Sequence, residues 1–378
     1  MDYELYVHIP FCRQKCFYCD FPSWAGRERY MEAYTEALCC EIAAQGSRFA
    51  PAGRAVTVYV GGGTPTALPQ ALLLRVLQAI REHFHLAAEA EFTVEANPGT
   101  VDGPYLAALR ESGANRLSLG VQSFDDGLLR RIGRIHTAAA ARQAFGLARA
   151  AGFANVSLDL MYGLPGQTLA GLAASVAAAV ALAPEHISIY GLQLEEGTVF
   201  ARQQEQGRLT LPDEAAAEAV YDYMTAELPR CGYQRYEISN FARPGYESRH
   251  NLGYWQDVPY LGLGAAAHSY WQGQRRENTA DIAGYIRQVM AGESPSREEE
   301  PATRSIQLEE FCFLALRTVR GIDRAAFQAK FGCTLESVYA AVLQDMQAKG
   351  LLVVDEAGAR LTERGMKYGN VVFGAFLL

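Results

Sequence analysis

The sequence lacks any apolar run long enough to span a bilayer. Its longest stretch of small apolar residues, Leu172 to Ala183, covers about three helical turns, whereas a membrane span needs about 20 residues. The first residues, MDYELYVHIPF, contain two carboxylates and no early lysine or arginine, which is not the pattern of a secretory signal. We therefore expect a cytoplasmic protein whose thiols stay reduced.

The chain also has fewer basic than acidic residues. The chain has 34 lysines and arginines against 42 acidic residues, a net charge of −8. This balance disfavours a generally basic surface for nucleic acid. Hydrophobic residues make up 49% and charged residues 20%, which excludes wholesale disorder. The 378 residues suffice for two or three domains, or for one barrel with an appendage.

Cysteine is too sparse for a disulfide scaffold. Of the eight cysteines, three fall close together, namely Cys12, Cys16 and Cys19. A zinc site usually has a fourth ligand, and a redox Cys-x-x-Cys pair would leave Cys12 unexplained. Three thiolates suit a four-iron cluster that leaves one iron open for another ligand.

Six short β-rich runs alternate with helical patterns in the first half of the chain. The predicted strands are Tyr3–Ile9, Val56–Val60, Glu91–Glu95, Arg116–Leu119, Asn155–Leu160 and His186–Leu192. The predicted helices are Glu28–Ala44, Leu72–His83, Gly103–Ser112, Thr137–Ala151 and Gly171–Ala183. Parallel strands need such crossovers, and polar or glycine-rich motifs follow nearly every strand. Because these motifs converge best at the mouth of a barrel, we predict an α/β fold with a partial (β/α)6 barrel of the TIM type.

Composition divides the chain into three predicted parts: the barrel in residues 1–235, a connecting region in 236–300 and a C-terminal domain in 301–378. The polar stretch Gly292–Thr303 is predicted to be a linker. Beyond it, three helical patterns, a short hairpin and a last helix from Glu363 predict a mostly helical, winged-helix-like domain. Its helix Leu335–Lys349 has few basic residues, so no nucleic-acid partner is expected.

Five motifs together resemble one family: HIPFCRQKCFYCDF, GGGTPT, GVQSF, DLMYGLPGQT and HNLGYW. It is the radical S-adenosylmethionine (SAM) family that contains oxygen-independent coproporphyrinogen III dehydrogenases and related heme chaperones. The resemblance covers the whole chain and implies a radical SAM barrel with a HemN-type C-terminal domain. It implies a 4Fe-4S cluster held by Cys12, Cys16 and Cys19. It also implies that SAM, at the open iron, is contacted by Tyr6, Tyr18, Gly62, Gly63, Thr64, Glu95, Gln122, Arg134 and Asp159.

Simpler roles stay open for several of these residues. Glycines let a backbone approach a ligand closely, but Gly62 and its neighbour can also form an ordinary turn. Glu95 and Asp159 can accept hydrogen bonds from ribose hydroxyls or an ammonium, and Arg134 can pair with a carboxylate. Equally, Asp159 can cap its strand, and Arg134 can be a solvated residue at a helix end.

Two departures separate the chain from the dehydrogenases of that family. Phe21 stands where they have a fourth cysteine, and the first strand is not preceded by their N-terminal extension. The segment HNLGYW resembles an HNxxYW motif of heme-binding members, which implies heme contacts from His250, Asn251, Tyr254 and Trp255. Imidazole is a common axial ligand of heme iron, and aromatic rings suit a flat macrocycle. The alternative is a buried histidine in a hydrogen-bonded core.

The resemblance thus implies a heme chaperone that binds a 4Fe-4S cluster, SAM and heme. It would pass heme to apo-haemoproteins, membrane-bound respiratory ones among them, and would meet a membrane only through such a partner. The alternative is an enzyme, an oxygen-independent coproporphyrinogen III dehydrogenase that decarboxylates its substrate oxidatively. A third, weaker alternative is a radical enzyme with another substrate.

Overall fold

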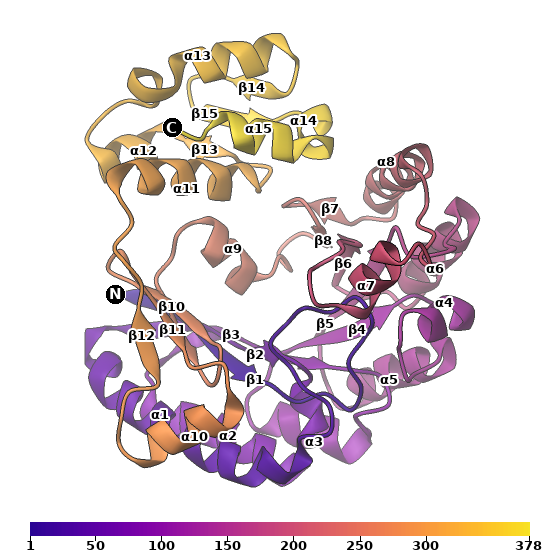
Figure 1. Cartoon of the computed structure of the whole chain (residues 1–378), viewed down its shortest axis with the longest axis vertical. Coiled ribbons are helices and arrows are strands. Elements are labelled where there is room, and N and C mark those ends of the chain that lie inside the picture. The colour runs from indigo at the N-terminus through magenta and orange to yellow at the C-terminus, as the bar shows by residue number, and fades with distance from the viewer.

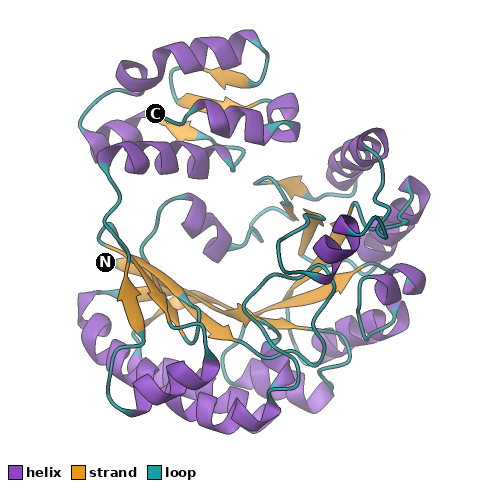
Figure 2. Ribbon diagram, viewed as in Figure 1, coloured by secondary structure: helices purple, strands orange, loops and turns teal.

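The computed structural model describes residues 1–378, and two separate sheets organise the chain (Figures 1 and 2). The larger sheet has twelve strands, and the smaller, near the C-terminus, has three. Figure 1 shows helices on one face of the large sheet and, facing its other side, helix α9 and the C-terminal unit. This arrangement leaves the inner face of the sheet covered by late parts of the chain.

Six parallel strands form the centre of the large sheet. They are β1 (Asp2–Ile9), β2 (Arg54–Gly62), β3 (Leu86–Ala96), β4 (Arg116–Gln122), β5 (Asn155–Tyr162) and β6 (His186–Gly191), paired in chain order. The helices between them are α1 (Met31–Phe49), α2 (Gln70–His83), α3 (Gly103–Glu111), α4 (Asp126–Arg131), α5 (Ala138–Ala150) and α6 (Leu169–Ala181). Three short 3-10 turns, Glu28–Tyr30, Ala50–Ala52 and Pro65–Ala67, complete this half. The predicted partial barrel is therefore confirmed.

Strand β1 shows why polar chemistry collects on the inner face. Its side chains alternate between two faces, as in any strand. One set belongs to the apolar core beneath the helices: Tyr3, Leu5, Val7 and Ile9. The other set lies on the opposite face and is polar: Glu4, Tyr6 and His8.

Short strands extend the sheet beyond the six predicted ones. On one edge β8 (Asn240–Ala242) pairs with β6, and β7 (Gln234–Arg235) follows. On the other, β9 (Tyr260–Leu263) pairs with β1, and β10 (His268–Trp271), β11 (Gln274–Asn278) and β12 (Ser296–Glu298) follow. The linker prediction for Gly292–Thr303 was wrong at β12, because Ser296–Glu298 pairs with β11 as an edge strand.

The same region contributes helices α7 (Val199–Glu205), α8 (Glu214–Arg230), α9 (Arg249–Trp255) and α10 (Ile282–Met290). The domain limits at 235/236 and 300/301 stay a prediction. The first of them falls between β7 and β8, two strands that pair with each other.

The C-terminal unit has its own apolar core around a three-stranded sheet. Its elements are α11 (Arg304–Leu316), β13 (Ile322–Asp323), α12 (Arg324–Phe331), α13 (Leu335–Ala348), β14 (Leu352–Val354), β15 (Gly358–Leu361), α14 (Glu363–Lys367) and α15 (Gly369–Ala375). The antiparallel pair β14–β15 is the predicted hairpin. The predicted helical C-terminal domain is confirmed.

Ion pairs tie the C-terminal unit to the large sheet and its helices. Lys367 lies 2.6 Å from Glu218 and 2.7 Å from Asp222, both on α8. Arg275 on β11 donates to both carboxylate oxygens of Glu310 on α11, at 2.5 and 3.0 Å. No helix in the structure combines the length and the hydropathy that a membrane span requires.

Candidate functional site

The three clustered cysteines lie in a loop that follows β1. Two backbone hydrogen bonds close its base, from Cys12 N to Trp24 O at 3.0 Å and from Trp24 N to Pro10 O at 2.9 Å. Lys15 donates to Ser23 O at 3.1 Å across the loop. All three thiols are free and partly exposed, and they line one cavity. The structure therefore brings together the residues that the spacing singled out.

The chemistry of this donor set fits a cluster better than a single ion. No three His, Cys, Asp or Glu side chains are grouped closely enough to hold one metal ion. In a four-iron cluster, by contrast, each thiolate binds a different iron. The Cys16 Sγ accepts a hydrogen bond from Arg134 Nη1 at 3.5 Å, and Cys12 Sγ lies 3.7 Å from Thr64 Oγ1. Burial raises the pKa of Cys19 to about 11.

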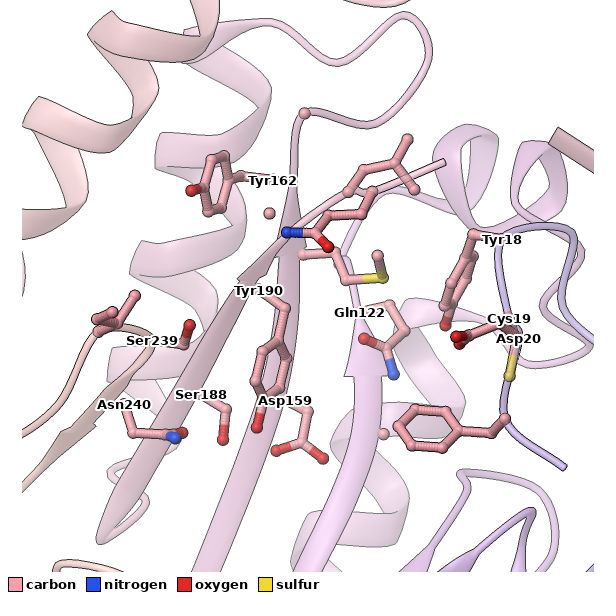
Figure 3. A pocket seen from close by; sticks show the side chains of 18 of the residues that line it. Tyr18, Cys19, Asp20, Gln122, Asp159, Tyr162, Ser188, Tyr190, Ser239 and Asn240 are labelled. Carbon is pink, nitrogen blue, oxygen red and sulfur yellow. The ribbon is translucent and has the colours of Figure 1, made fainter. Parts of the chain in front are cut away.

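The cavity has a volume of about 1080 Å³ and lies between the inner face of the sheet and the C-terminal unit. In Figure 3, Tyr18 and Cys19 lie on one side of it and Ser239 and Asn240 on the other. Between them the strand ends of β4, β5 and β6 present further polar side chains, including Gln122, Asp159, Ser188 and Tyr190. The cavity thus extends from the cysteine loop to β8.

Most of the residues assigned to SAM line this cavity. They are Tyr18, Gly62, Gly63, Thr64, Glu95, Gln122, Arg134 and Asp159. Tyr6 is the exception, because it does not line the cavity and its hydroxyl bonds to His8 Nδ1 at 2.8 Å. The other ring nitrogen of His8 bonds to Pro22 O at 2.8 Å. Tyr6 therefore supports the cysteine loop through His8.

The glycines of GGGTPT allow the end of β2 to pass close to β1 and the cysteine loop. Gly62 has a positive φ of 107°, and a Cβ there would lie 2.4 Å from His8 Cε1. A Cβ on Gly63 would lie 2.7 Å from Phe11 O. The space next to Gly62 and Gly63 is thus filled by other protein atoms. A residue with a side chain at either position would displace these atoms.

Two buried carboxyls lie on strands β3 and β5, which are separated by β4. Glu95 accepts hydrogen bonds from Tyr59 Oη at 2.7 Å and from Gly62 N at 3.2 Å, and burial raises its pKa to about 7. Asp159 accepts from Ser118 Oγ at 3.0 Å, and burial raises its pKa as well. Both retain oxygen lone pairs for a ligand, as a carboxylate has about four acceptor positions.

Two further polar residues shape the cavity wall near the cysteines. Gln122 has a positive φ of 66°, an uncommon conformation for a residue other than glycine that is often found at functional sites. Arg134 donates to Asn97 Oδ1 and Gly120 O in addition to Cys16. Arg134 is therefore half-buried and held by three hydrogen-bond partners, so the alternative of a solvated helix-end residue does not describe it.

The HNLGYW segment forms α9, and its residues divide between two faces. Asn251 and Trp255 line the cavity, whereas His250 and Tyr254 do not. Residues four apart share a helix face, so Asn251 lies on the same face as Trp255, and His250 lies on the same face as Tyr254. The HNxxYW spacing therefore places only two of the four predicted heme contacts at the cavity.

His250 is held in a buried network. It is 1% exposed, its Nδ1 lies 2.7 Å from Thr57 Oγ1, and its Nε2 lies 2.9 Å from Tyr254 Oη. Its ring stacks on Tyr59 at 5.1 Å, and burial lowers its pKa to about 3. Neither ring nitrogen is free for iron, so in this structure the expectation of an axial ligand gives way to the alternative of a core histidine.

The start of α9 is anchored by Glu91 on β3. Its carboxylate accepts hydrogen bonds from the backbone N–H groups of Arg249 and His250, both at 3.1 Å. A carboxylate at this position also interacts favourably with the positive end of the helix dipole. The Arg249 side chain donates to Glu89 O at 2.7 Å and lies outside the cavity.

Sequence patterns missed the cavity wall that the C-terminal unit supplies. It includes Arg317 after α11, Lys367 at the end of α14, Tyr368 between α14 and α15, and Val371 and Phe373 on α15. These residues belong to no local motif, and only the folded arrangement of the two units brings them to the site. Tyr190 and Leu192, at the end of β6, also line the cavity and do follow a predicted strand.

Two family models match separate parts of the chain, and known relatives match nearly all of it. The model of the radical SAM superfamily matches residues 6–178, and that of the HemN C-terminal domain matches residues 303–368. The heme chaperone HemW of Bacillus subtilis (strain 168) is 40% identical over 98% of both chains. HemW of Escherichia coli (strain K12) is 35% identical over 99% of this chain and 98% of its own.

A solved structure agrees with the fold. Coproporphyrinogen III oxidase (HemN) from Escherichia coli, a radical SAM enzyme, superimposes with a TM-score of 0.87 at 27% identity. The match covers 99% of this chain and 89% of that one. Membership of the superfamily implies a 4Fe-4S cluster and SAM. Because relatives of 35% identity or more extend over nearly the whole chain, the protein belongs to the HemW family of radical SAM proteins.

Proposed function

We propose that the protein is a heme chaperone that binds a 4Fe-4S cluster, SAM and heme and passes heme to apo-haemoproteins. One observation carries the proposal. A single cavity joins the cysteine loop at one side to aromatic and cationic side chains of α9 and the C-terminal unit at the other. The relatives reported above are heme chaperones, which supports heme as the cargo of this protein.

The cysteine side of the cavity is the proposed cofactor site. Cys12, Cys16 and Cys19 would each bind one iron of the cluster, and SAM would take the open iron. When bound, the cluster supplies an electron for chemistry at SAM. The chain's own part is to hold SAM through the cavity-lining residues assigned to it: Tyr18, Gly62, Gly63, Thr64, Glu95, Gln122, Arg134 and Asp159.

The side formed by α9 and the C-terminal unit is the proposed heme site. Asn251 and Trp255 contribute from α9, and Phe373 contributes from α15. Heme is flat and largely apolar, so aromatic walls suit it. A volume of about 1080 Å³ lies at the upper end of ordinary ligand pockets, which supports room for SAM and a macrocycle together. His250 and Tyr254 are proposed to position α9.

One observation favours the second candidate, coproporphyrinogen III oxidation, namely the close structural match to HemN. Phe21 argues for the chaperone. It is 59% exposed, lines the cavity and stands at the position of the fourth cysteine of the dehydrogenases. A phenylalanine has no thiol to contribute there, and it adds apolar surface at the cavity.

The recipients and the cellular location are part of the proposal. We propose that the chaperone works in the cytoplasm and delivers heme to apo-haemoproteins, including membrane-bound respiratory ones. Association with a membrane would then come from the recipient.

Two assays on anaerobically reconstituted protein test this proposal. Heme titration should give a saturable Soret band at a stoichiometry of one, and incubation with coproporphyrinogen III, SAM and a reductant should release no carbon dioxide. Absence of saturable heme binding together with carbon dioxide release would establish the enzyme instead.

A further inference from the structure

Arg317 is a cavity-lining cation that the protein does not neutralise. It follows the last residue of α11, and its Nε is buried without a hydrogen-bond partner. Burial lowers the pKa of Arg317, and the charge of Glu237 acts in the opposite direction. The Glu237 carboxyl accepts from Ser239 N at 2.8 Å, and its own pKa is raised by burial. A half-buried guanidinium without a paired carboxylate is costly unless a ligand supplies the anion.

Trp255 of α9 lies directly beneath this guanidinium. The Cζ atom of Arg317 is 4.6 Å from the centre of the Trp255 ring system, a cation–π contact between α9 and the C-terminal unit. The indole Nε1 is also buried without a partner. Phe373 contributes a second ring, 6.0 Å from the same Cζ. Two unpaired N–H donors and two aromatic rings thus meet at one corner of the cavity.

Most of the other cations that line the cavity have partners within the protein. Lys15 donates to Ser23 O at 3.1 Å in the cysteine loop. Lys367 is paired with two carboxylates of α8. Arg134 bonds to Asn97, Gly120 and Cys16. Arg116 also has an Nε without a partner, but it is 2% exposed and lies near Glu91 and Asp159, whose charges act to raise its pKa. Arg317, by contrast, is only half-buried. Arg317 is therefore the cation best placed to receive an anionic group from outside.

The position of this corner indicates which anion it receives. Thr318, the next residue, pairs with Glu237, which precedes the Ser239–Asn240 segment. Figure 3 shows Ser239 and Asn240 across the cavity from Tyr18 and Cys19. Arg317 thus belongs to the side away from the cysteines. The guanidinium beside the cysteines is Arg134, which lies 3.5 Å from Cys16 Sγ and is the one proposed above to contact SAM.

We propose that Arg317 and Trp255 form the subsite that holds a propionate carboxylate of heme. The terminal N–H groups of an arginine match a carboxylate in a bidentate pair, while the adjoining rings offer an apolar surface to the edge of the macrocycle. This inference rests on the proposed function and adds to it the contact that orients heme. Because Arg317 and Trp255 come from different units, heme in this subsite would hold α9 and the C-terminal unit together.

Heme and its dimethyl ester, which has no propionate charge, distinguish the subsite from general apolar binding. Wild-type protein should bind the ester at least about tenfold more weakly than heme, as expected for a lost charge-assisted contact. Arg317→Gln should weaken heme binding by a similar factor and leave ester binding unchanged. Arg320→Gln, the same change at an exposed arginine three residues on, should alter neither.

The remaining outcomes are separable. Equal affinities of wild-type protein for heme and ester would overturn the subsite while leaving heme binding intact, and this result needs no variant. Unchanged heme affinity in folded Arg317→Gln protein would overturn it as well, as would a loss of SAM affinity in that variant without a loss of heme affinity. Failure of wild-type protein to bind heme at all would overturn the proposed function itself.

Discussion

The cysteine loop and helix α9 both present their motif residues at short spacing, but the two segments differ in where those residues point. In the loop, Cys12, Cys16 and Cys19 all line the cavity. In α9, His250 and Tyr254 bond to each other on one face, and Asn251 and Trp255 line the cavity from the other. A motif in a loop can direct every side chain to one ligand, whereas a motif on a helix is divided by the helical period.

This difference assigns two tasks to the HNLGYW segment. The buried face anchors α9 to the sheet through Thr57 and the stacked ring of Tyr59. The other face supplies contacts at the cavity. Each of the following predictions tests the cysteine loop or one face of α9 separately.

The largest effect is expected in the loop. Cys16→Ala should abolish the absorption and electron paramagnetic resonance spectra of the 4Fe-4S cluster, because a second iron would lose its thiolate. Cys39→Ala, a change on α1 away from the cavity, should leave both spectra intact. A full cluster in reconstituted Cys16→Ala protein would refute the assignment.

The next effect concerns the anchoring face of α9. His250→Ala should lower the free energy of unfolding by about 3 kcal/mol, since it opens a buried space and leaves two hydroxyl groups without partners. Chemical denaturation of the metal-free protein measures this loss. His85→Ala, at an exposed position, should cost less than about 0.5 kcal/mol. Equal costs for the two variants would show that His250 is not an anchor.

A smaller, pH-dependent effect is expected at Glu4, whose carboxyl lies 3.8 Å from His250 Nδ1. Burial raises the pKa of Glu4 to about 9 from an ordinary 4.5, so the folded state keeps a proton that the unfolded state releases. The stability due to this proton is complete below about pH 4.5 and is lost as the pH rises towards 9. As the pH rises from about 5.5 to 8.5, the free energy of unfolding should therefore fall by at least about 1 kcal/mol less for Glu4→Gln than for wild type. Denaturation curves with parallel pH dependence would contradict this.

Much of the cofactor side of the cavity could be predicted from the sequence. Parallel strands bring their carboxyl ends to one edge, so Glu95 and Asp159 were expected near the cysteines, and both line the cavity. Tyr6, which only the resemblance assigned to SAM, does not line the cavity, because its position on β1 directs it to His8 beneath the loop.

The heme side could be predicted only in part, for physical reasons. The orientation of His250 depends on Thr57, which lies 193 residues earlier on β2. Arg317 acquires its position from the contact between the segment after α11 and the segment between β7 and β8, where Thr318 bridges to Glu237. No local pattern records that contact. Strands β9 and β12, of four and three residues, are too short to show a clear alternation.

Heme titration of variants on the two faces of α9 tests the central claim most directly. Changing Asn251 and Trp255 together to alanine should weaken heme binding more than about tenfold while the cluster spectrum persists. Tyr254→Phe removes only the hydroxyl that bonds His250, so it should leave heme affinity within about twofold and lower stability by about 1 kcal/mol. If instead Tyr254→Phe abolished heme binding and the double variant bound heme like wild type, the division of α9 into an anchoring face and a heme face would be wrong.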